Sequence, residues 1–315
     1  MRPAPMRLAT ILRAAFAAAL ICGGAVTTTP VRAADPPALP ELRFVEIPAA
    51  ARAKYRGDRF SYMEAGKPDA PAMLLLHGIG ANSTYWRYQY AAFADKYRLI
   101  AWNAPGYYLT SQLREDKPSC DDYADAAEAF ADAMGLKQFI LVGNSFGSAI
   151  AQCFVRRHPE RVSKMILSGT SVGSKGTPPE VREKTFQRRQ KQFETAGGMN
   201  YARTVIGLVV APNVTPVAKQ LVMETLAGTS GSGYLQASFY AYDFDSLAFA
   251  KDIKTPTLLV HGSLDKIAPI ETTSVALSKA LPNAKLVRME GYGHLTEVET
   301  PDKVNAAWRD FLDGK

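Results

Sequence analysis

Short apolar runs alternate with amphipathic stretches along most of the chain. A continuous run such as Ala72–Leu76 is typical of a strand buried on both faces, whereas apolar residues three or four positions apart, as at Tyr123, Ala127 and Phe130, indicate helices. Eight segments are expected to be strands: Leu42–Ile47, Arg59–Met63, Ala72–Leu76, Arg98–Trp102, Gln138–Val142, Lys164–Ser168, Thr257–Val260 and Lys285–Met289. The alternation predicts an α/β fold, a mostly parallel eight-stranded sheet with helices on both faces.

One long interruption separates two of these expected strands. From Gly169 to Lys254 there are 86 residues, whereas a crossover between parallel strands needs only about a dozen. Helices are expected at Pro178–Thr195, Asn200–Val209, Thr215–Ala227 and Tyr234–Phe249. We therefore expect a helical lid, residues 171–252, inserted over the C-terminal edge of the sheet. Residues 34–170 and 253–315 would form the core.

The N-terminus has the pattern of a secretory signal peptide. Arg2, Arg7 and Arg13 precede the apolar run Ala14–Val26, and Val31-Arg32-Ala33 offers small side chains at the positions a signal peptidase requires. A membrane anchor is the alternative, but a spanning helix needs about 20 apolar residues. The sequence predicts cleavage after residue 33, export to the periplasm or beyond, and no stable membrane insertion.

Composition excludes several other classes of protein. A hydrophobic content of 47% with 21% charged residues favours a folded core over disorder. The formal net charge of +7 falls to +3 without residues 1–33, too little for a nucleic-acid-binding surface. Three cysteines exclude a disulfide-rich scaffold, and Cys120 and Cys153 could be bridged or free. Because neither metal-ligand spacing nor a Gly-x-Gly-x-x-Gly turn occurs, we expect no metal and no cofactor.

Ser145 is the candidate nucleophile. It is the centre of Gly143-Asn144-Ser145-Phe146-Gly147, which follows an expected strand and opens an expected helix. Small residues two positions to either side permit a turn tight enough to expose the hydroxyl at the top of the sheet. The alternative is a turn bordered by glycines with an inert serine, but the strand-to-helix context favours a nucleophile.

A serine hydroxyl needs a base to accept its proton, and the chain has four histidines. His294 lies in a glycine-rich loop after the last strand, where an imidazole can reach the sheet top. His158 lies at a helix end, and His77 and His261 end strands, positions that suit a structural role as well as a catalytic one. His294 is the best candidate for the base.

The imidazole in turn needs a carboxylate to orient it. Asp265 follows the strand Thr257–Val260 by a short loop at the same edge of the sheet. Glu290 and Glu297 compete with it, but Glu290 ends a strand and Glu297 is expected in a turn. The resulting chain order is serine, aspartate, histidine.

Backbone N–H groups could stabilise a developing oxyanion. His77-Gly78-Ile79-Gly80 follows the third strand, and its glycines permit N–H groups to turn inward. We assign the two donors to the main-chain N–H groups of Ile79 and Phe146. The alternative for this segment is an ordinary turn at the end of a strand.

Taken together, these motifs resemble the α/β-hydrolase superfamily, in particular its lidded esterases, lactonases and C–C bond hydrolases. The resemblance extends from about Phe44 to the C-terminus and implies the lid and the roles of Ser145, Asp265 and His294. Two departures stand out. Asn103 and Tyr108 occupy family positions usually held by Asp and Gly, and Ser148 replaces a common Gly. Tyr108 is therefore expected to reshape a wall of the pocket.

Two features of the expected lid bear on substrate. Aromatic residues crowd one segment and could roof a pocket, although packing of lid on core is the simpler interpretation: Tyr234, Phe239, Tyr240, Tyr242, Phe244 and Phe249. One helix is basic, with a solvated face as the default interpretation and anion steering as the alternative: Arg182, Lys184, Arg188, Arg189 and Lys191.

The sequence thus predicts an exported serine hydrolase that cleaves small carboxylic esters through an acyl-enzyme intermediate. The alternatives are a C–C bond hydrolase or enol-lactonase with the same triad, and a non-catalytic binding protein on a hydrolase fold. A small-molecule ester is the expected partner.

Overall fold

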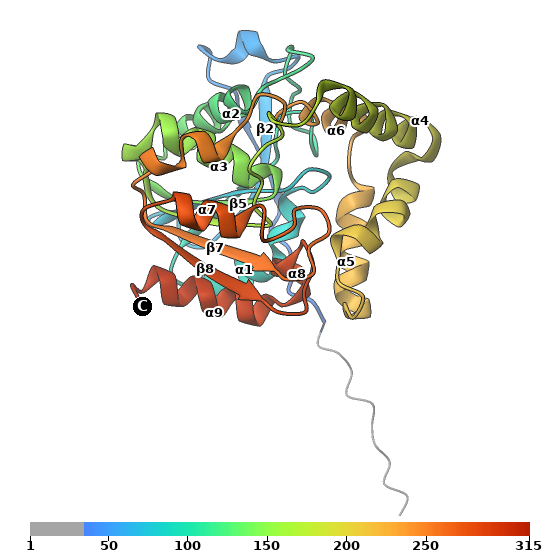
Figure 1. Cartoon of the computed structure of the whole chain (residues 1–315). Helices are drawn as coiled ribbons and strands as arrows, with labels where there is room; N and C mark the ends of the chain where they lie inside the picture. Colours follow the sequence, from blue (N-terminus) through green and yellow to red (C-terminus); the bar gives the residue numbers. More distant parts are fainter. Residues whose placement is uncertain (1–34) are drawn as a thin grey trace, which may run out of the picture. The chain divides into compact units, whose positions relative to one another are not determined.

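A mostly parallel sheet organises the chain in the computed structural model, which describes residues 35–315 apart from the side chains of 195–197 (Figure 1). The strands are β1 (Leu42–Glu46), β2 (Arg59–Ala65), β3 (Ala72–Leu76), β4 (Arg98–Trp102), β5 (Phe139–Asn144), β6 (Val162–Ser168), β7 (Thr257–Gly262) and β8 (Ala284–Met289). All eight coincide with segments predicted from the sequence, so the predicted fold class is confirmed. The predicted signal peptide lies outside the described residues.

The strand order in the sheet is β1-β2-β4-β3-β5-β6-β7-β8. β1 and β2 pair antiparallel with their neighbours, while β4, β3, β5, β6, β7 and β8 run parallel. The C-terminal ends of these six strands therefore meet at one edge of the sheet. Loops that leave that edge can bring together residues far apart in the sequence.

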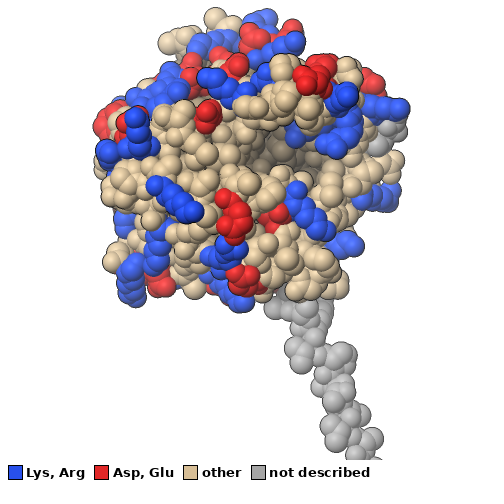
Figure 2. All heavy atoms as spheres, in the orientation of Figure 1, with Lys and Arg blue, Asp and Glu red and all other residues tan. Residues whose placement is uncertain are grey.

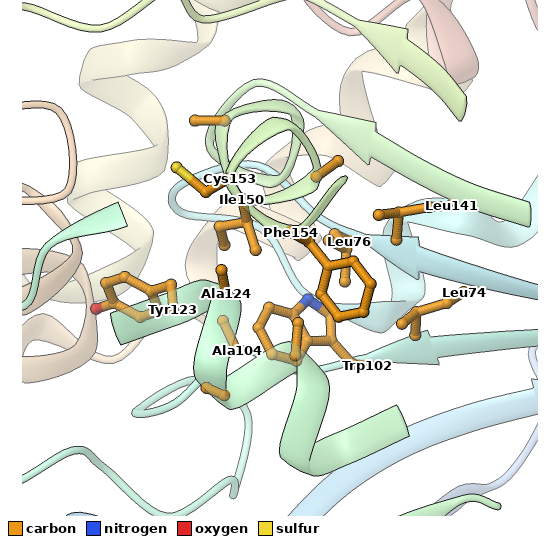
Figure 3. Close-up of a cluster of buried hydrophobic side chains, with 14 of the residues drawn as sticks. Leu74, Leu76, Trp102, Ala104, Tyr123, Ala124, Leu141, Ile150, Cys153 and Phe154 are labelled. Carbon is orange, nitrogen blue, oxygen red and sulfur yellow. The ribbon is translucent and has the colours of Figure 1, made fainter. Parts of the chain in front are cut away.

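Alternating side chains of the central strands fill two hydrophobic cores, one on each face of the sheet. Leu74 and Leu76 face one way and pack with helices α2 (Cys120–Ala133) and α3 (Phe146–Arg157), as Figure 3 shows. Met73 and Leu75 face the other way, into a second core. Burial on both faces explains why these strands are continuously apolar.

The second core is closed by helices that precede β4 and follow β8. They are α1 (Arg87–Phe93), α8 (Thr296–Glu299) and α9 (Pro301–Leu312). The α7 helix (Ser274–Ala280) contributes Leu277 to the first core. Short 3₁₀ turns complete the core at η1 (Arg52–Lys54), η2 (Ser83–Trp86) and η3 (Pro159–Arg161).

Between β6 and β7 the described chain forms helices and no strand, in the order α4 (Pro179–Val209), α5 (Pro216–Ala227), α6 (Gly231–Ala237), η4 (Ser246–Ala248) and η5 (Ala250–Asp252). The expected break between residues 195 and 200 is wrong, because α4 is one continuous helix. A Cβ atom on Gly198 would lie 2.2 Å from the backbone oxygen of Ala227. This glycine permits close packing of α4 on α5 and does not end the helix.

The predicted helix Tyr234–Phe249 is also wrong beyond Ala237. The backbone after α6 bonds to the segment that follows β6: Ser174 N–H donates to Ala241 O at 2.9 Å, and Ser246 N–H donates to Val172 O at 3.1 Å. A tertiary backbone pairing thus replaces the helical hydrogen bonds that the apolar spacing suggested.

The two cysteines in the described part of the chain are not joined by a disulfide. Cys120 and Cys153 are buried free thiols on α2 and α3, so the unbridged alternative holds in this structure. Burial, together with a hydrogen bond to Cys153, raises the pKa of the Cys120 thiol.

Within residues 35–315, no helix combines the length and the apolar character needed to span a bilayer.

Candidate active site

Ser145 lies on a strained turn between β5 and α3. Its φ of +52° and ψ of −113° are unusual for a residue with a side chain. A Cβ atom on Gly147 would lie 2.0 Å from Leu76 O, and one on Gly143 would lie 2.3 Å from Gly147 O. Both flanking positions therefore require glycine, which is the physical basis of the predicted motif. The turn places Ser145 at the C-terminal edge of the sheet.

Asp265 and His294, 29 residues apart in the chain, are in direct contact. The Nδ1 atom of His294 lies 2.6 Å from Oδ2 of Asp265. The other carboxylate oxygen accepts the N–H groups of Ile267 at 2.8 Å and Ala268 at 2.9 Å. Although burial opposes ionisation, the charge of His294 and hydrogen bonds from His261 and His294 hold the pKa of Asp265 well below its usual range. This carboxylate is therefore an ionised hydrogen-bond acceptor for the imidazole.

His261, which the sequence left open between two roles, also binds Asp265. Its Nε2 atom lies 2.9 Å from Oδ2 of Asp265 and 2.8 Å from Ala268 O. Because both partners are oxygen acceptors, this nitrogen carries a hydrogen. Its Nδ1 atom lies 2.7 Å from the hydroxyl oxygen of Ser274. His261 is fully buried and positions the carboxylate.

Ser145 and His294 line the same cavity, as do Gly78 and Ile79. Within the described part of the chain no hydrogen bond joins the Ser145 and His294 side chains, so the structure brings this pair to one cavity without bonding them. A Cβ atom on Gly78 would lie 3.2 Å from Cβ of Ser145, which places the turn after β3 against the serine.

The two residues expected to supply oxyanion donors lie in the two segments next to Ser145. Ile79 belongs to the turn after β3 and lines the cavity. Phe146 is the first residue of α3, and N–H groups in the first turn of a helix have no intrahelical acceptor. The two N–H groups belong to separate elements, the turn after β3 and the start of α3.

His77 has a structural role. Its Nδ1 atom lies 2.8 Å from Gly78 O, and its Nε2 atom accepts the N–H of Ala104 at 3.0 Å. Burial lowers the pKa of His77 to about 4. The neutral ring therefore ties the turn after β3 to the segment after β4.

The departures from the family pattern also have structural roles. Asn103 is fully buried, accepts the N–H of Ser83 at 2.7 Å and donates to the Ser61 hydroxyl at 2.9 Å. Ser148 donates to Ser145 O at 2.5 Å. Tyr108 does not line the cavity that holds Ser145, so the expectation that it reshapes that wall is wrong. Tyr108, which has a φ of +39°, lines a separate pocket.

The competing carboxylates lie elsewhere. Glu297 is fully buried and accepts hydrogen bonds from Tyr85 at 2.6 Å and from the Ser168 hydroxyl. Glu290 is exposed and pairs with Arg288 at 3.6 Å. In the described part of the chain, neither carboxylate is hydrogen-bonded to His294.

Sequence reasoning missed two residues that contact the His294 loop. Gly169, with φ +48°, lies so close that a Cβ atom would be 2.9 Å from Cε1 of His294. Glu299 accepts the N–H groups of Gly293 at 3.0 Å and Leu295 at 3.1 Å, the residues on either side of the histidine. No local sequence signal indicates either contact, because both depend on how separate loops meet in space.

The cavity has a volume of about 460 Å³ and lies between the sheet edge and the helices that follow β6. Figure 2 shows it as a hollow, with Lys and Arg side chains gathered on the side nearest α4. Of the six aromatic residues noted in the expected lid, only Tyr234 lines it. Tyr240 instead packs on Phe146, with ring centroids 4.9 Å apart. Packing on the core is therefore the main role of this aromatic cluster.

No group of His, Cys, Asp or Glu side chains in the described residues is arranged to hold a metal ion. The site consists of a serine, an imidazole, a buried carboxylate and backbone N–H groups at one sheet edge.

Comparison with known proteins gives the following similarities. The model of the α/β-hydrolase fold family matches residues 71–204. The chain is 26% identical to the bifunctional esterase/perhydrolase DCH of Acinetobacter calcoaceticus, over 77% of this chain and 92% of that protein. It is 27% identical to the 2-hydroxymuconate semialdehyde hydrolase of Pseudomonas sp. strain CF600, over 76% of this chain and 86% of the relative.

Solved structures share the fold. A thermophilic esterase from Thermogutta terrifontis superposes with a TM-score of 0.74 and 22% identity, covering 87% of this chain and 98% of that one. At this level of identity the likeness extends to the arrangement of strands and helices and not to the substrate.

Proposed function

The chain belongs to the α/β-hydrolase superfamily, and on this premise we propose that it is a serine hydrolase that cleaves small carboxylic esters through an acyl-enzyme intermediate. The observation that carries the proposal is the meeting of three separate loops at one cavity. Ser145 lines this cavity on its strained turn, and His294 lines it with Nδ1 bonded to Asp265. Because Nδ1 is engaged, Nε2 is the nitrogen available to the serine hydroxyl.

In the acylation half, Nε2 of His294 takes the proton from Ser145 Oγ as that oxygen attacks the ester carbonyl. The negative charge of the tetrahedral intermediate falls on the former carbonyl oxygen. The N–H groups of Ile79 and Phe146 donate to it. Collapse of the intermediate breaks the ester C–O bond, and the imidazolium returns its proton to the departing alcohol.

In the deacylation half, water takes the place of the alcohol. His294 accepts a proton from water as its oxygen attacks the acyl carbonyl, and the second intermediate releases the acid and regenerates Ser145. Asp265 stabilises the imidazolium in both halves. Its ionised state and its further contacts with His261 and two backbone N–H groups support this assignment.

Replacement of the nucleophile tests the proposal. Ser145→Ala should lower kcat towards a chromogenic p-nitrophenyl ester by about 10⁴-fold or more, the scale of nucleophile loss in serine hydrolases. It should also abolish labelling by a fluorophosphonate. Ser163→Ala, at an exposed serine near the opposite end of β6, is the matched control and should retain both. Near-normal turnover or labelling of the Ser145→Ala protein would refute the assignment.

A second candidate is cleavage of a C–C bond by the same residues. Similarity to the 2-hydroxymuconate semialdehyde hydrolase favours it, and an enol-lactone is a further possible substrate. A panel that compares short p-nitrophenyl esters with ring-cleavage products and enol-lactones separates these activities. Absence of both turnover and fluorophosphonate labelling would instead favour a non-catalytic binding protein.

We also propose that residues 1–33 are an export signal and that residues 171–252 act as a lid on a core of 34–170 and 253–315. The charged, apolar and small-residue segments in order support the first part. The lack of strands between β6 and β7 in the described chain supports the second. Intact-mass measurement of protein recovered from the periplasm should show a chain that begins at residue 34, and an uncleaved chain would contradict the export signal.

A further inference from the structure

Three cationic side chains of α4 lie at the cavity that holds Ser145. They are Arg188, Arg189 and Lys191, three of the five basic residues for which a solvated face was the default interpretation. None of the described residues that line the cavity is an aspartate or a glutamate. The lining therefore carries positive charge with no opposing charge of its own.

The two arginines are not engaged by acidic neighbours. Within residues 35–315 neither Arg188 nor Arg189 forms an ion pair with a carboxylate. The nearby acids of α4 are bound instead to glutamines: Gln187 donates to Glu183, and Gln190 donates to Glu194, both at 2.8 Å. The arginine charges are thus available to a ligand.

Arg182, six residues before Arg188 on α4, is a cation with a structural role. Its guanidinium donates to Tyr242 O at 2.6 Å and lies 4.9 Å from the centroid of the Tyr242 ring. It does not line the cavity. Arg182 is thus held by a backbone oxygen away from the cavity, whereas Arg188 and Arg189 line the cavity.

A continuous wall connects the cations to the turn beside Ser145. The Arg189 guanidinium lies 5.7 Å from the Tyr234 ring centroid, and the Tyr234 and Tyr201 rings are 5.0 Å apart. The hydroxyl of Tyr201 in turn lies 3.0 Å from where a Cβ atom on Gly80 would be. A ligand that reacts at Ser145 can therefore extend along this wall to the guanidinium groups.

The lining between these ends is mainly apolar, although Gln192, Thr204 and Thr225 also line the cavity. On α4 and α5 this lining includes aliphatic side chains of Val205, Leu208, Val222 and Leu226. Such a surface favours a hydrocarbon segment, whereas the guanidinium groups favour a carboxylate, which they can bind in a bidentate manner. The two requirements together describe a molecule with a reactive ester at one end and a negative charge at the other.

We propose that the cavity selects carboxylic esters that carry a free carboxylate remote from the scissile bond, such as half-esters of dicarboxylic acids, and that Arg188 and Arg189 determine this specificity. The inference rests on the proposed function, because it names the substrate class of the same site. Charge attraction at the cavity opening would also speed the encounter with an anionic substrate, and salt would weaken it.

The kinetic test compares two chromogenic substrates with the same adipoyl chain, mono-p-nitrophenyl adipate and its neutral methyl ester. We expect kcat/KM to favour the half-ester by about tenfold or more, the size expected for charge-assisted hydrogen bonds. In Arg188→Gln/Arg189→Gln the preference should fall to about one. Raising NaCl from 0.02 to 0.5 M should erode the preference of the parent protein.

Lys184→Gln is the matched control, because this lysine is exposed on the same helix and does not line the cavity. It should retain the preference. A parent protein that favours the neutral ester, or a double variant that keeps the parent preference, would overturn the proposal.

A binding measurement separates this proposal from the proposed activity. Titration calorimetry of Ser145→Ala with monomethyl adipate should show binding that is about tenfold weaker when both arginines are also replaced. If the parent protein cleaves no ester but this difference is present, the proposed function fails and the anion site stands. Binding no tighter than that of dimethyl adipate would overturn the anion site itself.

Discussion

At the scale of single residues, the site depends on backbone conformations that a side chain ordinarily avoids. Ser145 adopts φ +52°, and strain of this kind costs about 1–3 kcal/mol. Its N–H donates to Ser168 O at 2.9 Å, which helps to hold the turn. Gly169, next to Ser168, leaves room for the His294 ring because it has no Cβ atom. The serine and the histidine are therefore both positioned by the end of β6.

His77 gives a prediction for stability against pH. Its pKa is about 4 in the folded protein, whereas an unfolded chain has a histidine pKa of about 6.5. As pH falls from about 6.5 to 4 the unfolded chain binds a proton that the folded protein excludes. The free energy of unfolding should therefore decrease by about 1.4 kcal/mol per pH unit from this group.

Urea denaturation at pH 7.5 and pH 5.0 measures this effect. His77→Gln should be less stable at pH 7.5, because the bonds to Gly78 and Ala104 are disturbed. It should also lose less stability than the parent between the two pH values, since the excluded proton is gone. An equal loss in both proteins would show that His77 is not the group responsible.

At the scale of elements, the loop that carries His294 is hydrogen-bonded to the end of α4. His294 N–H donates to Val209 O at 3.0 Å. Glu299 on α8 accepts the N–H of Ala211, just past α4, at 2.7 Å as well as the N–H groups on both sides of His294. A shift of the helix end would therefore move the loop that carries the imidazole.

Glu299→Gln tests this connection. A carboxylate accepts at both oxygens, whereas the amide group of glutamine would oppose at least one of the three N–H donors. We expect a loss of about 1–3 kcal/mol in the free energy of unfolding. In esterase assays kcat should fall about tenfold with a smaller change in KM, because the imidazole and not the cavity wall is displaced.

Glu290→Gln is the control, since Glu290 is exposed near the same loop. It should leave kcat and KM unchanged. A Glu299→Gln protein that loses stability but keeps its kcat would show that the glutamate supports the fold without positioning His294.

At the scale of the whole molecule, local sequence patterns predicted the strands and the turn at Ser145, because interactions between residues close in the sequence determine these features. Apolar runs located every strand, and the glycine spacing around Ser145 reflects close approach within one turn. The end of the helix at Ala237, the continuity of α4 through Gly198 and the contact of Gly169 with His294 were not predictable. Each of these features depends on contacts between segments that are far apart in the sequence. Local patterns of residues do not contain information about such contacts.

The second hydrophobic core extends from the sheet into the helices between β6 and β7. Tyr201 and Ile206 of α4 and Val222 and Leu226 of α5 belong to the same buried cluster as Leu75 of β3. Because these helices share a core with the sheet, we expect them not to melt separately. The described residues should unfold in a single cooperative transition.

Two optical signals can test this expectation. All three tryptophans, Trp86, Trp102 and Trp308, are buried beside the sheet and none lies in the helices between β6 and β7. Their fluorescence therefore reports the core, while far-UV circular dichroism also reports α4 and α5. The two urea transitions should coincide, and Leu226→Ala should shift both together by about 2–5 kcal/mol. Loss of helical signal at lower urea than the fluorescence change would show that the inserted helices unfold independently, and the joint core would then contribute little to their stability.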